Sequence, residues 1–131
     1  MPVTDKQMIG KLGEELAADF LRNEGYTIVT QNVHLGKQEI DIIAEDNDFF
    51  VFVEVKTRSM APGEASRYGS PSDAVDAHKR YYVTRAAKTY TRLHPTRKKL
   101  RFDVIEVYLS HDEQPKILAV RHMKDAFRAY S

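Results

Sequence analysis

The sequence predicts an α/β domain in which a mixed central sheet is flanked by helices. Two stretches carry apolar residues at helical spacing, and the stretches around them alternate or run apolar as strands do. The predicted order is α-β-β-β-α-β-β-α, which mixes hairpin-connected strands with a strand that follows a helix. A chain of 131 residues suits one domain, so we assign residues 1–131 to a single unit.

The first helix and the first three strands follow from apolar spacing. The helix is predicted over residues 4–24, and Gly25 can close it in the left-handed conformation. Strands are predicted over residues 26–33, 38–45 and 49–57. The last of these strands is apolar on both faces until it reaches Glu54, which is typical of a central strand.

The second half of the chain begins with a loop and a long helix. Residues 59–69 are rich in Gly, Ser and Pro, which predicts a loop. Ser70 as N-cap and Pro71 at the first helical position start a helix that Pro95 ends. Two strands and a final helical turn or two complete the order, over residues 101–109, 117–120 and 123–130.

Composition excludes several classes of protein. The chain is 42% hydrophobic and 30% charged, so it can build one ordinary core. Its longest apolar run, residues 49–53, is too short to span a bilayer, and the N-terminus lacks the apolar segment of a signal peptide. The absence of cysteine excludes disulfides and thiolate metal sites and fits a reducing compartment. We therefore expect a cytoplasmic protein with no membrane partner.

Charge is distributed unevenly along the chain. Residues 1–66 carry 6 Lys/Arg and 12 Asp/Glu, whereas residues 67–131 carry 14 and 7. Residues 74–101 hold nine Lys/Arg against one acid, Asp76, with tyrosines between them. This asymmetry indicates an anionic partner, although a solvated helix face is the alternative. The basic segment lacks a base-reading motif, so binding to nucleic acid would depend on the phosphate backbone and on shape.

The third strand ends in a charged pair, Glu54 and Lys56, whose side chains share one face because they are two residues apart. If residues 46–49 close a hairpin, Asp41 lies opposite Glu54 and Glu39 opposite Lys56, with Cβ atoms about 4.5–5.5 Å apart. A slip of one residue would separate the two acids. In this register the two faces of the second strand carry Glu39, Asp41 and Ile43, and Ile40, Ile42 and Ala44.

Two opposed carboxylates repel each other, and a divalent cation compensates for this. Mg²⁺ takes oxygen ligands, and Asp41, Glu54 and the backbone carbonyl of Val55 supply such a set. Lys56 beside the ion would position a water or neutralise charge on a phosphate. We expect Mn²⁺ to substitute for Mg²⁺. The alternative is a solvated surface pair that contributes little.

Five motifs together resemble a known family. They read GKLGEELAADFL, GYTIVTQNVH, QEIDIIAEDNDFFVFVEVKTR, SDAVDAHKR and RFDVI, and they cover residues 10–105 in order. This set is similar to the YraN-like family of predicted endonucleases, within the PD-(D/E)xK nuclease superfamily, which also resembles archaeal Holliday-junction resolvases. The resemblance implies a restriction-endonuclease-like fold and carries Asp41, Glu54 and Lys56 over as catalytic residues.

The resemblance also adds residues that apolar spacing does not single out. It makes Glu14, at the edge of the first helix's apolar face, a further catalytic residue and metal ligand. Lys79 lies where the family often has Lys. The chain departs from the family at Gln38, where Gly is usual, and at His34, where Arg is usual; Gln38 could replace a backbone contact near the metal. The predicted nucleic-acid contacts are Arg58, Lys79, Arg80, Lys88 and Gln38.

The remaining polar residues receive structural interpretations. Asp103 is predicted to pair with a base such as Arg101. The histidines show no ligand-like spacing, so His78, His94, His111 and His122 are predicted to lie on the surface.

Residues and resemblance together predict an Mg²⁺-dependent endonuclease that cuts branched or otherwise structured DNA by metal-assisted hydrolysis. Three alternatives stay open: a catalytically inactive nucleic-acid-binding module, an RNA nuclease, and a small protein whose basic helix binds an acidic partner. Junction-cutting relatives act as dimers so as to cut two strands, and the resemblance therefore extends the expectation of a homodimer to this chain.

Overall fold

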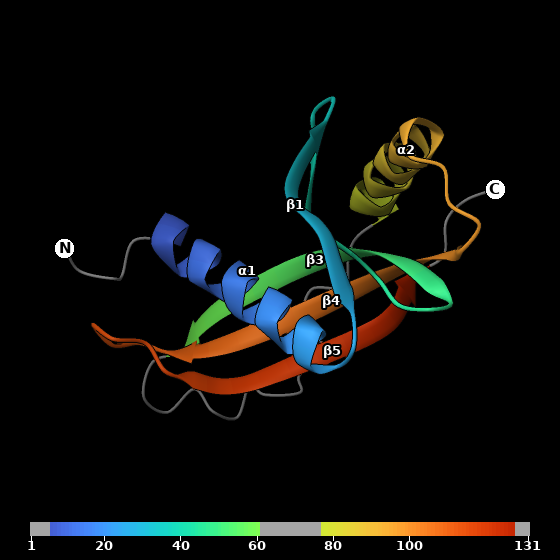
Figure 1. Cartoon of the computed structure of the whole chain (residues 1–131). Helices are drawn as coiled ribbons and strands as arrows, with labels where there is room; N and C mark the ends of the chain where they lie inside the picture. Colours follow the sequence, from blue (N-terminus) through green and yellow to red (C-terminus); the bar gives the residue numbers. More distant parts are fainter. Residues whose placement is uncertain (1–5, 61–76, 128–131) are drawn as a thin grey trace.

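The computed structural model describes residues 6–60 and 77–127, which form two helices and five strands (Figure 1). The elements are α1 Lys6–Asn23, β1 Thr27–Leu35, β2 Gln38–Glu45, β3 Phe49–Met60, α2 Ala77–Leu93, β4 Lys99–Ser110 and β5 Ile117–Phe127. The predicted helix start at residue 4, most of the loop over 59–69 and the helix start at Ser70 and Pro71 lie outside the described residues. No helix within the described ranges is long and apolar enough to cross a bilayer.

The five strands form one mixed sheet in the order β1-β2-β3-β4-β5. β3 and β4 pair in parallel from Phe49↔Lys99 to Met60↔Ser110, and the other neighbours are antiparallel. The prediction of a mixed sheet with residues 49–57 in its central strand is therefore confirmed. Parallel pairing requires a crossover connection, and α2 lies within the segment that joins β3 to β4.

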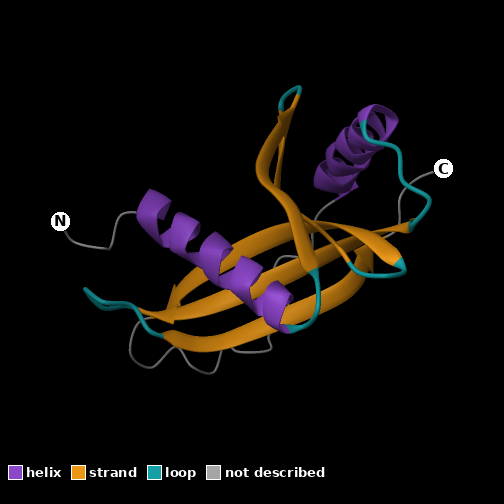
Figure 2. Cartoon of the chain, in the orientation of Figure 1, coloured by secondary structure: helices purple, strands orange, loops and turns teal. Residues whose placement is uncertain are grey.

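Each helix packs against its own apolar cluster on the sheet. Figure 2 shows the two helices beside the strands of the sheet. The cluster under α1 includes Leu21, Val53 and Ile105, and the cluster under α2 includes Phe52 and Val83. Burying a side chain of this size contributes about 1.5–3 kcal/mol. Val53 and Phe52 are adjacent in β3, and they point to opposite faces of the sheet, Val53 toward α1 and Phe52 toward α2.

Gly13 brings α1 into direct contact with β3. A Cβ atom at Gly13 would lie 1.8 Å from the Thr57 side-chain oxygen, so only glycine allows this approach. Gly13 is buried, and the next residue in α1 is Glu14. The glycine therefore fixes the distance at which Glu14 stands from the sheet.

The hairpin between β2 and β3 has the predicted register from Ile42 to Glu45, but the strands do not pair beyond Ile42, so the predicted pairs Asp41–Glu54 and Glu39–Lys56 do not form. The pairs run from Ile42↔Val53 to Glu45↔Phe50, and the Asp46 side chain closes the turn by accepting hydrogen bonds from the Asp48 and Phe49 amides. Beyond Ile42 the two strands separate, and Figure 1 shows the outer part of β1 and its partner strand rising away from the sheet. Asp41 is the first residue past this separation.

The faces of β2 are not those predicted. Ile42 packs in the cluster under α1, whereas Ile40 packs with Ile43 in the cluster under α2. Strict alternation would place Ile40 and Ile42 together. The alternation fails at Asp41, where β2 leaves β3 and where β1 carries an irregular residue, Asn32, with a φ of 54°.

The predicted helix over residues 123–130 is wrong as far as the structure describes it. β5 continues to Phe127, and Met123 and Phe127 pair with Val104 and Phe102 of β4. A bulge at Asp125, with a φ of 54°, interrupts the strand, and this break in the period-two pattern gave the sequence its helical appearance. Pairing with β4 decides the conformation of this segment.

Candidate metal centre

Three carboxylates from two elements converge where β2 leaves β3. Oxygen atoms of Glu14 in α1 and of Glu39 and Asp41 in β2 all lie within 4.8 Å of one another. Gly13 seats Glu14 against the sheet, and the irregular stretch of β2 beyond Ile42 leaves Glu39 and Asp41 within reach of Glu14. The cluster therefore depends on α1 and the hairpin together.

Asp41 stands at the centre of the cluster. Its Oδ2 atom accepts a hydrogen bond of 2.8 Å from the Val55 amide, in place of the ladder bonds that end at Ile42. Burial raises the pKa of Asp41 to about 7, the charge of Glu54 adds to this, and the Val55 hydrogen bond opposes it; Glu14 and Glu39 raise it further. A carboxyl with such a pKa needs a proton or a cation to balance the acids around it.

Glu14 lies in the same acidic environment. Burial and the charge of Glu39 raise its pKa, whereas hydrogen bonds with Asn32 and Asp41 lower it. The acids around Glu14 thus oppose its ionisation, and a bound cation would favour it.

Glu54 reaches the cluster from β3 and meets a lysine from α2. The Lys79 Nζ atom lies 3.5 Å from the Glu54 Oε1 atom, and the two side chains are 38% and 22% exposed. A contact at this exposure stabilises the fold only slightly. Its consequence is positional, because it places an ammonium group beside the carboxylates.

The carboxylates open into a cavity of about 600 Å³. This cavity extends from the cluster along the N-terminal half of α1 and the end of β3. Its lining consists of Lys6, Ile9, Gly10, Glu14, Glu39, Asp41, Glu54, Val55, Thr57, Ser59, Lys79 and His111. Acids gather in one part of the wall, with Lys79 beside them.

The donor set fits a small hard cation. Oxygens on opposite sides of an Mg²⁺ ion are about 4.2 Å apart, so a spread within 4.8 Å closes with little movement. Val55 lines the same cavity, and its amide is hydrogen-bonded to Asp41. Glu14, Asp41, Glu54 and Val55, all predicted as ligands, are therefore brought together. Glu39 was not predicted as a ligand. Its place two residues before Asp41 in the same strand was the sequence feature that could have indicated it.

Other predicted site residues lie elsewhere. Lys56 shares the face of Glu54 by alternation, and it lies opposite Glu106 of β4 in the parallel register. It is not among the described residues that line the cavity. Arg58 Nε binds the buried Glu106 at 3.2 Å. The Gln38 amide donates to the neighbouring Glu39 carbonyl, so this side chain has a local role in the hairpin.

Two of the three predicted nucleic-acid contacts on α2, Arg80 and Lys88, do not line the cavity. Arg80 stacks over the Phe127 ring at 5.8 Å. Lys88 is exposed on the outer side of the helix. Of the predicted phosphate contacts, Lys79 is the one that lines the cavity.

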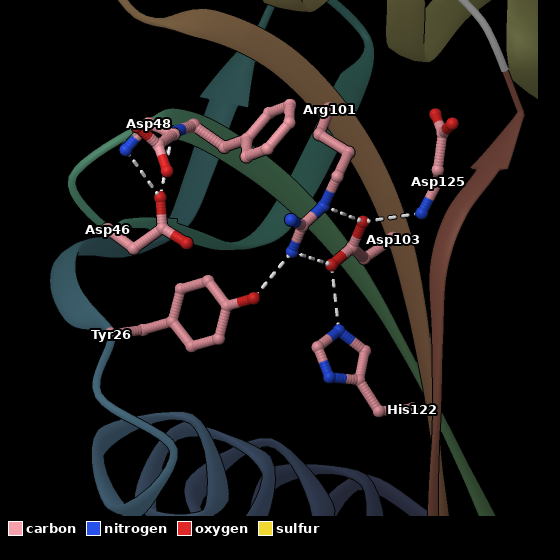
Figure 3. Close-up of polar contacts among 8 residues, drawn as sticks. Tyr26, Asp46, Asp48, Arg101, Asp103, His122 and Asp125 are labelled. Carbon is pink, nitrogen blue, oxygen red and sulfur yellow. Dashed lines mark hydrogen bonds and ion pairs between the residues drawn. The ribbon is translucent and has the colours of Figure 1, made fainter.

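A second buried carboxylate, Asp103, has the opposite surroundings (Figure 3). Arg101 donates two bonds of 2.8 Å to it, His122 lies 2.7 Å away, and the Asp125 amide donates a bond of 2.9 Å. Burial would raise the pKa of Asp103, but the bonds from His122, Arg101 and the Asp125 amide outweigh burial and lower it. Asp103 is thus a structural acid, as predicted.

His122 corrects one prediction. Its side chain is 7% exposed, although it was predicted, with three other histidines, to lie on the surface. Its ring also packs edge-on against Phe20 and Tyr26. His122 is buried because the strand over residues 117–127 carries it under α1, which the predicted helix would not have done.

Fold and site together define an α/β protein with a carboxylate-lined cavity between a helix and a parting hairpin. The chain belongs to the uncharacterised protein family UPF0102, whose model matches residues 13–107.

Relatives in the same family extend over nearly the whole chain. UPF0102 proteins of Alkaliphilus oremlandii and Chlorobium chlorochromatii are 43% and 40% identical, each over 91% of this chain and over 97% and 90% of their own lengths. UPF0102 protein STH1475 of Symbiobacterium thermophilum is 42% identical over 92% of this chain and 97% of its own. The structure of Pyrococcus furiosus SfsA in complex with Ca²⁺ matches with 12% identity and a TM-score of 0.46, over 91% of this chain and 65% of that one, a likeness too weak to support an argument.

Proposed function

We propose that this protein is a metal-dependent DNA endonuclease that hydrolyses phosphodiester bonds. The observation that carries the proposal is the convergence of Glu14, Glu39, Asp41 and Glu54 on one cavity, beside Lys79. Burial and the charges of neighbouring acids raise the pKa of Asp41 and of Glu14, and a cation would offset this repulsion. A cation held by carboxylates in an open cavity is suited to phosphate chemistry. The resemblance to the YraN-like family and the PD-(D/E)xK superfamily supports the same activity.

The roles follow from position. Asp41 and Glu54 would hold the ion with the Val55 carbonyl, and Glu14 and Glu39 would complete the set from the other side. A bound Mg²⁺ or Mn²⁺ polarises a phosphoryl oxygen and lowers the pKa of a ligated water. The Val55 amide keeps Asp41 oriented through its 2.8 Å hydrogen bond, so one oxygen of Asp41 is committed to the fold and the other is available to a ligand.

Two lysines are assigned to the phosphate. Lys79 is held by Glu54 at 3.5 Å and would exchange this partner for a phosphate when a cation takes over Glu54. Lys56 follows Glu54 on the same strand face, where a small rotation of its long side chain would bring the ammonium toward the nucleophile or the developing charge.

The surface of α2 supports a nucleic-acid partner. The helix contains five Lys/Arg and no acid over Ala77–Leu93, and Tyr81 and Tyr82 are 46% and 41% exposed on it. Such a surface binds the phosphate backbone without reading sequence. Binding without base readout favours a substrate selected by shape, and we propose branched or otherwise structured DNA. A dimer would place two such cavities on one junction.

Cleavage of a substrate panel tests the proposal. We expect Mn²⁺ and Mg²⁺ to support cutting of flapped or four-way DNA in preference to linear duplex, and Asp41→Asn and Glu54→Gln to abolish it. The matched control is Glu15→Gln, which removes an exposed acid one residue from Glu14. Cutting that survives in Asp41→Asn would show that the assigned residues are not the catalytic ones.

The same panel separates the alternative functions. Metal and DNA binding with no cleavage of any substrate would identify a nucleic-acid-binding module. Faster cutting of RNA than of DNA would identify an RNA nuclease. Salt dependence of DNA binding with a slope of about −0.9 per phosphate contact would exclude binding through an acidic protein partner alone.

A further inference from the structure

Two large aromatic side chains are exposed next to each other in the first half of α2. Tyr81 and Tyr82 are 46% and 41% exposed, and their rings meet edge to face with centroids 5.3 Å apart. The side of α2 that faces the sheet is formed by other residues, among them Val83 and Tyr90, which belong to the core cluster under this helix. Single exposed apolar residues are ordinary, whereas adjoining aromatic rings on a surface indicate a binding partner.

Arg85 holds the outer ring of this pair. Its Cζ atom lies 5.6 Å from the centroid of the Tyr81 ring, and its Nη1 atom donates a hydrogen bond of 3.3 Å to the Tyr81 hydroxyl. The guanidinium and the Tyr82 ring thus restrict the rotation of Tyr81. A surface that is ordered before a ligand arrives loses less conformational entropy on binding.

Helical spacing connects the aromatic pair with the cation site. Lys79, which lines the cavity and lies 3.5 Å from Glu54, comes three residues before Tyr82, and Arg85 comes three residues after it. Residues three apart are neighbours on a helix surface, and Tyr82 follows Lys79 by about 4.5 Å along the axis. Lys79, Tyr82 and Arg85 therefore follow one flank of α2 away from the carboxylates.

The charge around the two rings defines the partner. α2 carries five Lys/Arg and no acid over Ala77–Leu93, so the rings stand among cations. A second copy of the chain would bring the same positive charge to this surface and would be repelled. Proteins that bind single-stranded nucleic acid combine a basic surface for the backbone with aromatic side chains on which bases stack. In a duplex each base is covered by its neighbours, so an aromatic surface can stack only on unpaired bases.

We propose that Tyr81 and Tyr82 form a stacking platform for unpaired bases of the substrate. Lys79 would contact the backbone near the cation, and a neighbouring unpaired base would stack on the rings. This inference rests on the proposed endonuclease function, and it narrows structured DNA to DNA with unpaired nucleotides beside the scissile phosphate, such as a flap or a splayed end. A fully paired duplex would gain nothing from the rings.

Equilibrium binding to DNA in EDTA tests the proposal without cleavage. The probes are a duplex with a thymine flap and a fully paired duplex of the same length. We expect Tyr81→Ala and Tyr82→Ala each to lower affinity for the flap about 5- to 150-fold and to leave affinity for the duplex unchanged. No loss of flap affinity, or an equal loss on both DNAs, would overturn the platform.

Matched variants assign the effect to the rings. Tyr81→Phe keeps the ring and should bind the flap as wild type does, whereas Tyr81→Leu keeps an apolar side chain and should lose affinity as Tyr81→Ala does. Leu118→Ala removes an exposed apolar side chain from β5 and should change nothing. Urea midpoints near that of wild type would show that the variants are folded. A Leu variant that binds the flap as tightly as wild type would refute stacking.

Removing a base from the DNA identifies the contact. An abasic site keeps the phosphates of the flap, so it can be moved along the strand without changing the charge. At the position that stacks, the abasic site should weaken binding by wild type and have no further effect on Tyr81→Ala. Equal losses in the two proteins at every position would overturn the proposal.

The outcomes separate this inference from the function on which it rests. A flap preference that disappears in Tyr81→Ala, in a protein that cuts no DNA, would leave the platform standing and refute the endonuclease. Cutting of flapped DNA with the same preference in wild type and in both tyrosine variants would keep the endonuclease and overturn the platform. Tyrosine variants that change the oligomeric state in sedimentation, with no loss of flap affinity, would identify the pair as a contact between copies of the chain and overturn the proposal.

Discussion

Replacing Asp41 by Asn is expected to stabilise the metal-free protein at neutral and alkaline pH while removing cation binding. Asn has the shape of Asp, and its side-chain oxygen can still accept the 2.8 Å bond from the Val55 amide. What the substitution removes is a negative charge that burial and three neighbouring acids disfavour. The stability gain is therefore electrostatic and should depend on pH.

The magnitude follows from the pKa. The ordinary value of 3.8 applies to the unfolded chain, and the folded value is about 7. A difference of about 3 units at about 1.4 kcal/mol per unit corresponds to about 4 kcal/mol as an upper limit. Because the folded pKa is raised, the stability from neutral Asp41 is complete below pH 3.8 and is lost as the pH rises to about 7. Asp41→Asn avoids this loss.

Urea unfolding in EDTA across this pH range measures the effect. The free-energy difference between Asp41→Asn and wild type should grow from pH 4 to pH 7 and then level off. Adding Mn²⁺ at about 100 times its Kd should stabilise wild type by about 2.7 kcal/mol and leave the variant unchanged. A variant less stable than wild type at pH 8.5 in EDTA, or one that Mn²⁺ stabilises equally, would refute the reasoning.

Three further substitutions give distinct outcomes. Asp103→Asn should lower the free energy of unfolding in urea by about 3–5 kcal/mol, because it leaves the buried Arg101 without its ion pair. Substitution by Asn should therefore destabilise the protein at Asp103 and stabilise it at Asp41. Gly13→Ala should cost about 1–3 kcal/mol through its clash with the Thr57 side chain, and Thr57→Gly should restore part of this loss; a Tm unchanged by Gly13→Ala would contradict the close packing. Lys79→Met should raise Mn²⁺ affinity a few-fold, because Glu54 loses a competing cation, and should weaken DNA binding; Lys88→Met is the control, which should weaken DNA binding alone.

The sequence predicted the parts of the site that depend on local geometry. The turn over residues 46–49 sets the hairpin register from Glu45 to Ile42, which leaves Asp41 at the end of the paired segment and beside β3. The place of Glu14 came from resemblance, since the reason for it is a contact between Gly13 and Thr57 that no local pattern reveals.

The parts that sequence did not predict depend on non-local packing. The alternation of β2 fails at Asp41, so Ile40 and Ile42 pack on opposite faces of the sheet. This happens where β2 leaves β3 and where β1 contains the irregular residue Asn32. Residues 123–127 have a helical appearance as an isolated segment, but β4 supplies an edge that makes them a strand. In both cases the deciding partner lies elsewhere in the chain.

The short paired segment between β2 and β3 affects how firmly the outer hairpin is attached to the sheet. β3 is joined to β4 along its whole length, whereas β2 is joined to β3 from Ile42 to Glu45. The outer hairpin is therefore the part of the sheet most easily detached, and it carries Glu39 and Asp41. A cation bound by residues of β2, α1 and β3 would hold the outer hairpin against the rest of the sheet. Amide hydrogens of β1 and β2 should therefore exchange more slowly when Mn²⁺ is present, whereas those of β4 should keep their rates.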